Sequence, residues 1–445
     1  MPAYAGMTDL IDRGTMRLWS AGIAAVIAAL APACAPAQPP AHSSFANPSA
    51  PVAIQERCTA DGIADTTSCY EAALLTVLEA EGVSGAMETL ETLADTDPAL
   101  QRHGHEYSHA IGLSAYETPA TVGSTFAACT PIFQSGCYHG VIQAYFADPA
   151  GAAANGGVTA ESAKALCADQ RENSSSSWLL FQCVHGMGHG LTSLNNYDLE
   201  KALEGCDLLD AVWEQDACYG GIFMENIVQA TAPHHALGRP ETSDEPSLTE
   251  QMAMPGHDHS EMAMEMDGSA TGVVTGLDPD DPHFPCSALP DRYLGACYEM
   301  QTSAMLFANG GDMAAAAAEC GEAPSRVRHL CYQSLGRDIS SYTAQSHTDA
   351  LRLCALAPGN YEAWCHVGFA KNLVDLTADP SDALAYCSKV RPGRNKEACY
   401  RATGEEIGVL TSDAERRADL CAPAPAEYRP FCRTGAGLSA LDLGV

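Results

Sequence analysis

Apolar and polar residues rarely alternate strictly along this chain, and such alternation is the pattern that half-buried strands produce. Residues 382–387 instead predict the end of one helix, and residues 389–396, which include Pro392 and Gly393, predict a turn. A second helix is predicted from Glu397 onward. The same succession recurs around the cysteine pairs at 354 and 365 and at 421 and 432. The chain therefore predicts an all-α fold made of helical hairpins.

The predicted hairpins follow a near-constant period. Ten marker positions, nine of them cysteine, lie mostly 33 to 35 residues apart: Cys69, His103, Cys137, Cys183, Cys218, Cys297, Cys331, Cys365, Cys399 and Cys432. Longer steps of 46 residues before Cys183 and 79 residues before Cys297 indicate insertions. A fixed period of this length is typical of stacked supersecondary units. One marker is exceptional, because His103 occupies a cysteine position and other histidines surround it.

In its 34-residue period and its paired helices, the segment 58–436 resembles tetratricopeptide-like and Sel1-like repeat proteins. The resemblance implies a scaffold that binds a protein or peptide, and it implies no catalysis. We expect an all-α fold, a right-handed type of α-solenoid, built from ~34-residue helical hairpins around one concave face. A protein or peptide partner would bind on that face.

Two positions after the marker are shared by many repeats. The first is tyrosine at Tyr70, Tyr138, Tyr219, Tyr298, Tyr332 and Tyr400. The third is small at Ala72, Gly140, Gly186, Gly221, Ser334, Gly368, Ala402 and Gly435, with Glu106 and Met300 as exceptions. We expect the tyrosines to pack in the core and the small residues to let neighbouring helices approach closely.

The N-terminus predicts an export leader over residues 1–37. Two arginines precede an apolar run over residues 18–31, which is too short to span a bilayer. Cleavage would follow Ala37, or it would precede Cys34, where Ala-Pro-Ala-Cys is similar to a bacterial lipoprotein box and predicts a lipid on Cys34. Residues 38–57, rich in Pro, Ala and Ser, predict a disordered tether. We therefore expect a periplasmic or outer-membrane-anchored protein.

Cysteine parity agrees with export. The total is 19, and either processing route removes Cys34 from the count of thiols and leaves an even number. Sequence-adjacent pairing then gives Cys58–Cys69, Cys129–Cys137, Cys167–Cys183, Cys206–Cys218, Cys286–Cys297, Cys320–Cys331, Cys354–Cys365, Cys387–Cys399 and Cys421–Cys432. Such a density of cysteines indicates an oxidising compartment. We expect disulfides rather than metal ligands, because the CxxC spacing of metal clusters is absent.

The formal net charge of -33 excludes nucleic acid as a partner, because nucleic-acid binding needs a basic face. The same charge argues against direct binding to an anionic membrane surface. Contact with a membrane is expected only through the leader or a lipid anchor.

Five histidines occupy the second and sixth positions after three consecutive markers: His105, His109, His139, His185 and His189. Residues at i and i+4 share one face of a helix, so two of these repeats each present a pair of imidazoles. Adjacent helices pack about 8–10 Å apart, so imidazoles from neighbouring repeats can meet on one metal ion. Such ligands suit zinc and copper, and also iron. Structural packing of these histidines is the alternative.

His105-Glu106-Tyr107-Ser108-His109 matches HExxH, which resembles the motif of zinc peptidases over these five residues. The resemblance implies that His105 and His109 bind zinc and that Glu106 is the general base. Zinc peptidases place this helix beneath a β-sheet, and no sheet is predicted here. Glu225 and Asn226 lie much further along the chain. The pattern allows two positions for them, in the lining of the same cleft or on a solvated helix face, and we expect the solvated face.

Residues 233–285 interrupt the period and are rich in proline and acidic residues, which predicts a mobile insertion. This insertion contains Met252, Met254, His257, His259, Met262, Met264 and Met266. That tract is similar to the Met/His-rich tracts of periplasmic copper-handling proteins, since thioethers suit Cu(I) and imidazoles suit Cu(II). An acidic low-complexity loop with incidental methionines is the alternative.

The sequence therefore predicts N-terminal repeats with the histidine cluster over residues 58–232, C-terminal repeats over 286–436 and a tail over 437–445. The leading hypothesis is an exported helical-repeat protein that binds a transition metal and acts in zinc or copper handling. The first alternative is a zinc-dependent hydrolase that uses Glu106. The second is a non-catalytic interaction scaffold.

Overall fold

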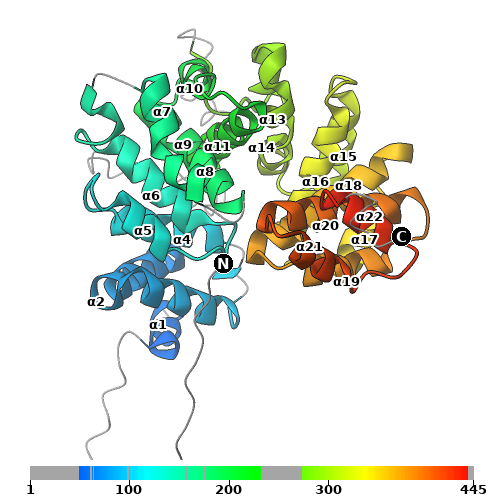
Figure 1. Cartoon of the computed structure of the whole chain (residues 1–445), viewed down its shortest axis with the longest axis horizontal. Helices are drawn as coiled ribbons and strands as arrows, with labels where there is room; N and C mark the ends of the chain where they lie inside the picture. The colour runs from blue at the N-terminus through cyan, green and yellow to red at the C-terminus, as the bar shows by residue number, and fades with distance from the viewer. Residues whose placement is uncertain are drawn as a thin grey trace, which may run out of the picture. The chain divides into compact units, whose positions relative to one another are not determined.

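The computed structural model describes residues 50–438 except 61–62, 64, 98–99, 102, 156–157, 174–176 and 232–272. These residues form helices and connecting turns, with no strand among them, which confirms the predicted all-α class (Figure 1). The first part contains α1 (Pro51–Cys58), α2 (Thr66–Ala94), α4 (Gly104–Ala115), α5 (Val122–Ala128), α6 (Gly136–Ala147), η1 (Ala152–Asn155), α7 (Ala160–Leu166), α8 (Ala168–Asn173), α9 (Trp178–Leu194), α10 (Leu199–Cys206) and α11 (Val212–Thr231).

The second part begins after residue 272 and has the same character. It contains η5 (Cys286–Ala288), η6 (Asp291–Tyr293), α13 (Leu294–Tyr298), α14 (Gln301–Ala308), α15 (Met313–Glu322), α16 (Arg328–Tyr342), α17 (His347–Cys354), η7 (Gly359–Tyr361), α18 (Glu362–Thr377), α19 (Ser381–Lys389), α20 (Arg394–Leu410), α21 (Ala414–Cys421) and α22 (Arg429–Gly435). None of the described helices combines the length and the apolar character needed to cross a bilayer.

All nine predicted disulfides are present, with Cα–Cα distances of 5.4 to 5.9 Å. In the hairpin of α19 and α20, Cys387 near the end of α19 is bonded to Cys399 near the start of α20. The pair Cys354–Cys365 joins α17 to α18 in the same way. Most of the disulfides fix the end of a short helix to the first half of a following long helix, as the repeat pattern predicts. The pair Cys286–Cys297 instead joins η5 to the short α13, and Cys421–Cys432 joins α21 to the equally short α22.

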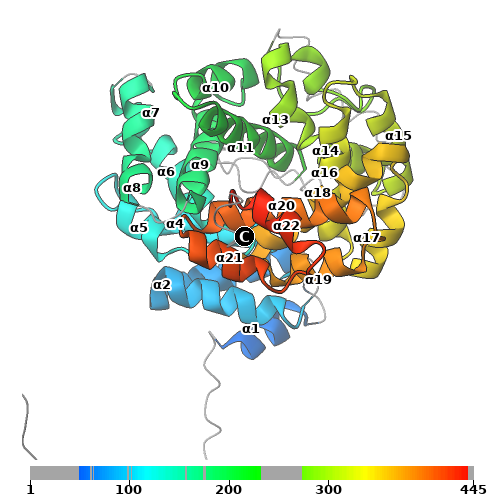
Figure 2. The same ribbon diagram turned by 45° about the vertical axis from the view of Figure 1, so that its right-hand side comes forward.

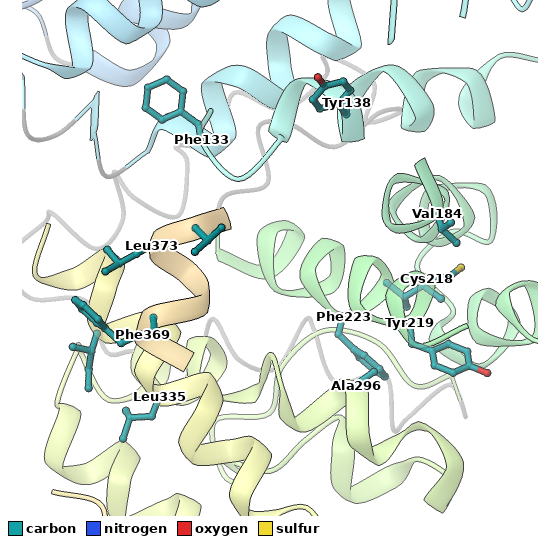
Figure 3. Close-up of a cluster of buried hydrophobic side chains, with 14 of the residues drawn as sticks. Phe133, Tyr138, Val184, Cys218, Tyr219, Phe223, Ala296, Leu335, Phe369 and Leu373 are labelled. Carbon is teal, nitrogen blue, oxygen red and sulfur yellow. The ribbon is translucent and has the colours of Figure 1, made fainter. Parts of the chain in front are cut away.

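The long helices pack side by side in chain order (Figure 2). In the first part α4 packs on α6, α6 on α9 and α9 on α11, and in the second α16 packs on α18, α18 on α20 and α20 on α22. Figure 3 shows buried apolar side chains of the core, among them Tyr138 of α6, Val184 of α9, and Tyr219 and Phe223 of α11. The inner long helices are thus covered on two sides by neighbouring long helices.

The repeated tyrosines are core residues, as predicted. Their exposed fractions run from 0% at Tyr400 to 5% at Tyr138 and Tyr219. In two repeats the hydroxyl group donates a hydrogen bond to the short helix of the same hairpin, from Tyr138 to the carbonyl oxygen of Cys129 and from Tyr332 to that of Ala317. In these repeats the tyrosine reinforces the junction that the disulfide closes one residue earlier.

Glycine pairs let neighbouring long helices touch through their backbones. A Cβ atom on Gly221 of α11 would lie 2.0 Å from the carbonyl oxygen of His185 in α9, and one on Gly188 of α9 would lie 2.1 Å from that of Cys218 in α11. The same reciprocal arrangement recurs at Gly112 and Gly140, at Gly336 and Gly368, and at Gly404 and Gly435. No larger residue fits at such distances, so the prediction that the third position after the marker allows close approach is confirmed.

Two predicted boundaries are wrong. Residues 51–58 form α1, which begins with Pro51 at its first turn and ends at a disulfide, so the last part of the expected tether is helical. Residues 273–285 of the expected mobile insertion are held: Asn226 of α11 bonds both the N–H and the carbonyl oxygen of Gly276, and the N–H of Leu199 donates to Val274. The leader with Cys34, residues 38–49, residues 232–272 and residues 439–445 lie outside the described residues.

Candidate metal centre

The structure brings the five predicted histidines together from three adjacent helices. His105 and His109 belong to α4, His139 to α6, and His185 and His189 to α9. Ring centroids lie 5.5 Å apart for His105–His139, 5.4 Å for His109–His189, 4.7 Å for His139–His185 and 5.2 Å for His139–His189. All but His105 are buried, with 1% to 6% of the residue surface exposed.

One ring nitrogen of each of four histidines contacts an oxygen atom. His185 Nδ1 lies 3.1 Å from the carbonyl oxygen of Ala217, and His105 Nδ1 lies 3.1 Å from that of Phe133. His139 Nε2 lies 2.9 Å from Gln182 Oε1, and His189 Nδ1 lies 2.9 Å from Glu225 Oε2. Each oxygen accepts a hydrogen bond, so the proton of a neutral ring sits on the nitrogen that faces it. The lone pair of each ring is therefore on its other nitrogen.

Three of these remaining nitrogens are buried and make no hydrogen bond to a described residue: His139 Nδ1, His185 Nε2 and His189 Nε2. A buried polar atom without a partner costs about 1–3 kcal/mol, so three in one place need a physical reason. The same three residues form a group in which one potential ligand atom of each lies within 4.8 Å of those of the others. A bound cation would use all three lone pairs at once.

Burial fixes the protonation state that metal binding needs. It lowers the pKa of His139 and of His185 well below the usual value, and it lowers the pKa of His189 to about 3. Burial also lowers the pKa of His105, although the nearby charge of Glu106 acts in the opposite direction. These rings are therefore neutral near pH 7, and the neutral imidazole is the form that binds a metal ion.

Glu225 is a component of the centre, although the sequence favoured a solvated helix face for it. The residue is 3% exposed, and its Oε1 accepts a hydrogen bond of 3.1 Å from Gln143 Nε2. A second group of potential ligands consists of His109, His189 and Glu225. Burial raises the pKa of Glu225 to about 7, despite the opposing hydrogen bond from Gln143. The favoured reading is wrong for Asn226 too, since Asn226 is 2% exposed.

Glu106, the predicted general base, takes no part in either group of ligands. Its carboxylate forms an ion pair of 3.6 Å with Nδ1 of His103, the histidine at the marker position. Burial raises the pKa of Glu106, but the hydrogen bond and charge of His103 outweigh this effect and lower it to about 2. A carboxylate with so low a pKa is a weak base near neutral pH.

The predicted copper tract from Met252 to Met266 lies outside the described residues. Comparison of the chain with protein-family models, with curated proteins and with solved structures finds no match. The disulfides indicate an oxidising environment. The geometry of the histidine centre therefore carries the functional argument.

Proposed function

We propose that the protein binds a transition-metal ion through His139, His185 and His189, with His105 and His109 completing the surroundings, and that it acts in zinc or copper handling. Two observations on His139, His185 and His189 carry the proposal. One ring nitrogen of each is buried without a hydrogen-bond partner among the described residues, and one potential ligand atom of each lies within 4.8 Å of those of the other two. Two nitrogens bound to one zinc ion at about 2.0–2.1 Å lie roughly 3.3 Å apart.

The outer hydrogen bonds support the same proposal. Ligand histidines in metalloproteins usually donate their second N–H to a carboxylate or a carbonyl oxygen, which fixes the tautomer and the ring orientation. Ala217, Gln182 and Glu225 supply such oxygens to His185, His139 and His189 respectively. An imidazole donor set suits zinc, copper, iron and nickel, and we propose zinc or copper among these.

Calorimetric titration of the metal-free protein tests the centre directly. We expect about one Zn²⁺ ion per chain at this site, and we expect His185→Ala to weaken zinc binding by more than about 100-fold, because a ligand is lost. His329→Ala is the matched control, since the His329 ring packs against Trp364, with ring centroids 4.6 Å apart, and lies outside the centre. Zinc is the probe because the methionine tract is expected to bind copper. Absence of zinc binding, or equal affinities for the two variants, would contradict the proposal.

Two isosteric substitutions separate the roles of the glutamates. Glu225→Gln removes the charge that orients His189, so we expect zinc affinity to fall about 10- to 100-fold. Glu106→Gln should leave zinc affinity unchanged, because Glu106 is paired with His103. Titration of both variants with Zn²⁺ measures the difference, and equal effects would show that Glu225 has no special role. If the alternative hydrolase function holds, Glu106→Gln retains its metal and loses turnover.

We also propose that the hairpins form an α-solenoid of the right-handed type that resembles tetratricopeptide-like repeats. The side-by-side packing of long helices in chain order supports this architecture. We propose that the protein is exported to the periplasm, with or without a lipid on Cys34. The disulfides agree with that oxidising compartment. From the repeat architecture we also propose that a protein or peptide partner binds on the concave face.

A further inference from the structure

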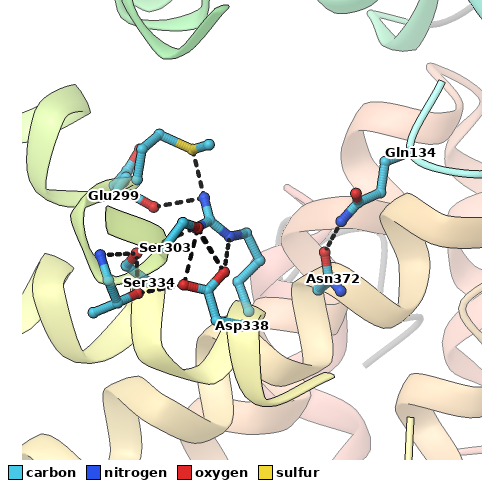
Figure 4. Close-up of polar contacts among 9 residues, drawn as sticks. Gln134, Glu299, Ser303, Ser334, Asp338 and Asn372 are labelled. Carbon is cyan, nitrogen blue, oxygen red and sulfur yellow. Dashed lines mark hydrogen bonds and ion pairs between the residues drawn. The ribbon is translucent and has the colours of Figure 1, made fainter. Parts of the chain in front are cut away.

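The carboxylate of Glu225 differs from its counterparts in other repeats. Glu225 is the seventh residue after its marker, and Asp338 and Glu406 occupy the same position in two repeats of the second part. Asp338 forms an ion pair of 2.7 Å with Arg337 (Figure 4). Glu406 forms one of 2.9 Å with Lys371. In those two repeats a basic side chain therefore neutralises the acid.

Glu225 has no basic partner of this kind. Among the described residues neither a lysine nor an arginine forms an ion pair with it, and its Oε2 lies 2.9 Å from Nδ1 of His189. A histidine that binds a metal ion is neutral, so it brings no positive charge. The ion proposed above binds the other nitrogen of this ring, and the ring then separates that ion from the carboxylate. A carboxylate that is only 3% exposed is costly without a cation, so this one needs a positive charge closer to it.

Gln143 supplies an unmatched oxygen atom beside Glu225. Its side chain is 0% exposed, and its Nε2 donates hydrogen bonds of 3.1 Å to Glu225 Oε1 and 2.9 Å to Ser193 Oγ. Its Oε1 is buried and accepts no hydrogen bond from a described residue. The amide cannot be turned over to correct this, because Oε1 would then face a carboxylate oxygen. A cation is the partner that satisfies both this oxygen and the carboxylate.

The repeat register brings an imidazole to the same place. His109, Gln143 and His189 are each the sixth residue after a marker, in three consecutive repeats whose long helices α4, α6 and α9 pack side by side. The rings of His109 and His189 have centroids 5.4 Å apart. One potential ligand atom of His109, one of His189 and one of Glu225 lie within 4.8 Å of one another. This row therefore holds nitrogen and oxygen donors beside the first ion.

We propose that a second divalent cation binds between His109, Gln143 and Glu225, and that the histidine centre is dinuclear. The inference deepens the proposed function, on which it rests for the neighbouring ion. One imidazole nitrogen and two oxygens form a harder donor set than three imidazoles, so this site accepts ions such as Mn²⁺ that favour oxygen. Its ion binds more weakly than the first, because two divalent charges so close together repel each other.

Manganese titration of zinc-loaded protein tests the second site. One equivalent of Zn²⁺ is bound first, Mn²⁺ is then added, and electron paramagnetic resonance measures the Mn²⁺ that stays free. We expect about one Mn²⁺ ion per chain at this site, and we expect His109→Ala to weaken its binding at least about tenfold, because a ligand is lost. Glu415→Gln, which removes an exposed carboxylate on α21, is the control and should leave this ion bound. Thioethers do not suit Mn²⁺, so the methionine tract does not compete.

Gln143→Glu is expected to have the opposite effect. It replaces a neutral ligand oxygen by a charged one, and the affinity of an oxygen site rises with the charge of its ligands. Binding of Mn²⁺ should therefore strengthen about tenfold. Without a second ion the new carboxylate would only repel Glu225, and the variant would lose thermal stability without gaining affinity for Mn²⁺.

Two results would overturn the inference. One is equal Mn²⁺ affinity of His109→Ala and the unaltered protein, and the other is a Gln143→Glu variant that binds Mn²⁺ no more tightly. Zinc content is measured on the same samples, and circular dichroism checks that each variant is folded. Bound zinc without bound Mn²⁺ contradicts the second site alone, whereas bound Mn²⁺ without bound zinc contradicts the proposed function alone.

Discussion

Reduction of the nine disulfides is expected to unfold the protein in buffer without denaturant. Each disulfide closes a loop with a sequence separation between 8 and 16 residues. In the chain-entropy model such a loop stabilises the folded state by about 2–3 kcal/mol. Nine of them together exceed the about 5–15 kcal/mol by which a typical domain is stable. The helical circular-dichroism signal should therefore disappear after complete reduction.

Removal of a single disulfide measures how much one bond contributes to the free energy of unfolding. The double substitution of Cys387 and Cys399 by alanine should lower the free energy of unfolding by about 2–3 kcal/mol, measured in guanidinium chloride. Ser388→Ala is the control, because Ser388 is exposed on α19 next to Cys387 and belongs to no disulfide. A reduced protein that keeps its helical signal and a cooperative thermal transition would contradict the expectation.

Gly221→Ala is expected to destabilise the protein and to weaken zinc binding at the same time. The new Cβ would lie 2.0 Å from the carbonyl oxygen of His185, so α11 must move away from α9. Overpacking of this kind costs about 1–3 kcal/mol, and a clash with backbone is harder to relieve than one with a side chain. The same movement separates Glu225 on α11 from His189 on α9, which are 2.9 Å apart.

Gly123→Ala is the matched control for this substitution. Gly123 lies inside α5, and a Cβ there would meet no atom within 4 Å. Alanine is the better helix former, so the control should be neutral or up to about 1 kcal/mol more stable. Urea titration and zinc calorimetry on both variants give the comparison. If Gly221→Ala unfolds at the same denaturant concentration as Gly123→Ala and binds zinc normally, the close approach of α9 and α11 is not needed.

Local regularity explains what the sequence predicts well. The period places each cysteine beside its partner, and the tyrosine and small-residue positions follow the same register. The five histidines fall on equivalent positions of consecutive repeats, so stacking alone is enough to bring them together. The second member of each glycine pair, such as Gly188, keeps the same register too, five residues after the marker in three of the four pairs. The sequence therefore also carries a signal for the second member of each pair.

Other features depend on contacts that no local pattern encodes. Glu225 looks like one more acid on a helix in an acidic chain, and its burial depends on Gln143 and His189, which belong to other helices. No sequence pattern predicts that Gln182 and the carbonyl oxygen of Ala217 orient the rings of His139 and His185. The hydrogen bond between Gln134 and Asn372 is the extreme case, because the two residues are 238 positions apart in the chain (Figure 4).

The locality of the disulfides has a consequence for how the native pairing is found. Eighteen cysteines can pair completely in about 34 million ways. Each cysteine here is bonded to a neighbouring cysteine in the sequence, and the short loop between them closes at a lower entropic cost than a loop to a more distant cysteine. The native disulfides can therefore form one hairpin at a time, while the rest of the chain is still being exported. A duplication or deletion of one whole repeat would also leave every remaining cysteine with its partner, so the length of the array can change in evolution without a penalty in mispaired thiols.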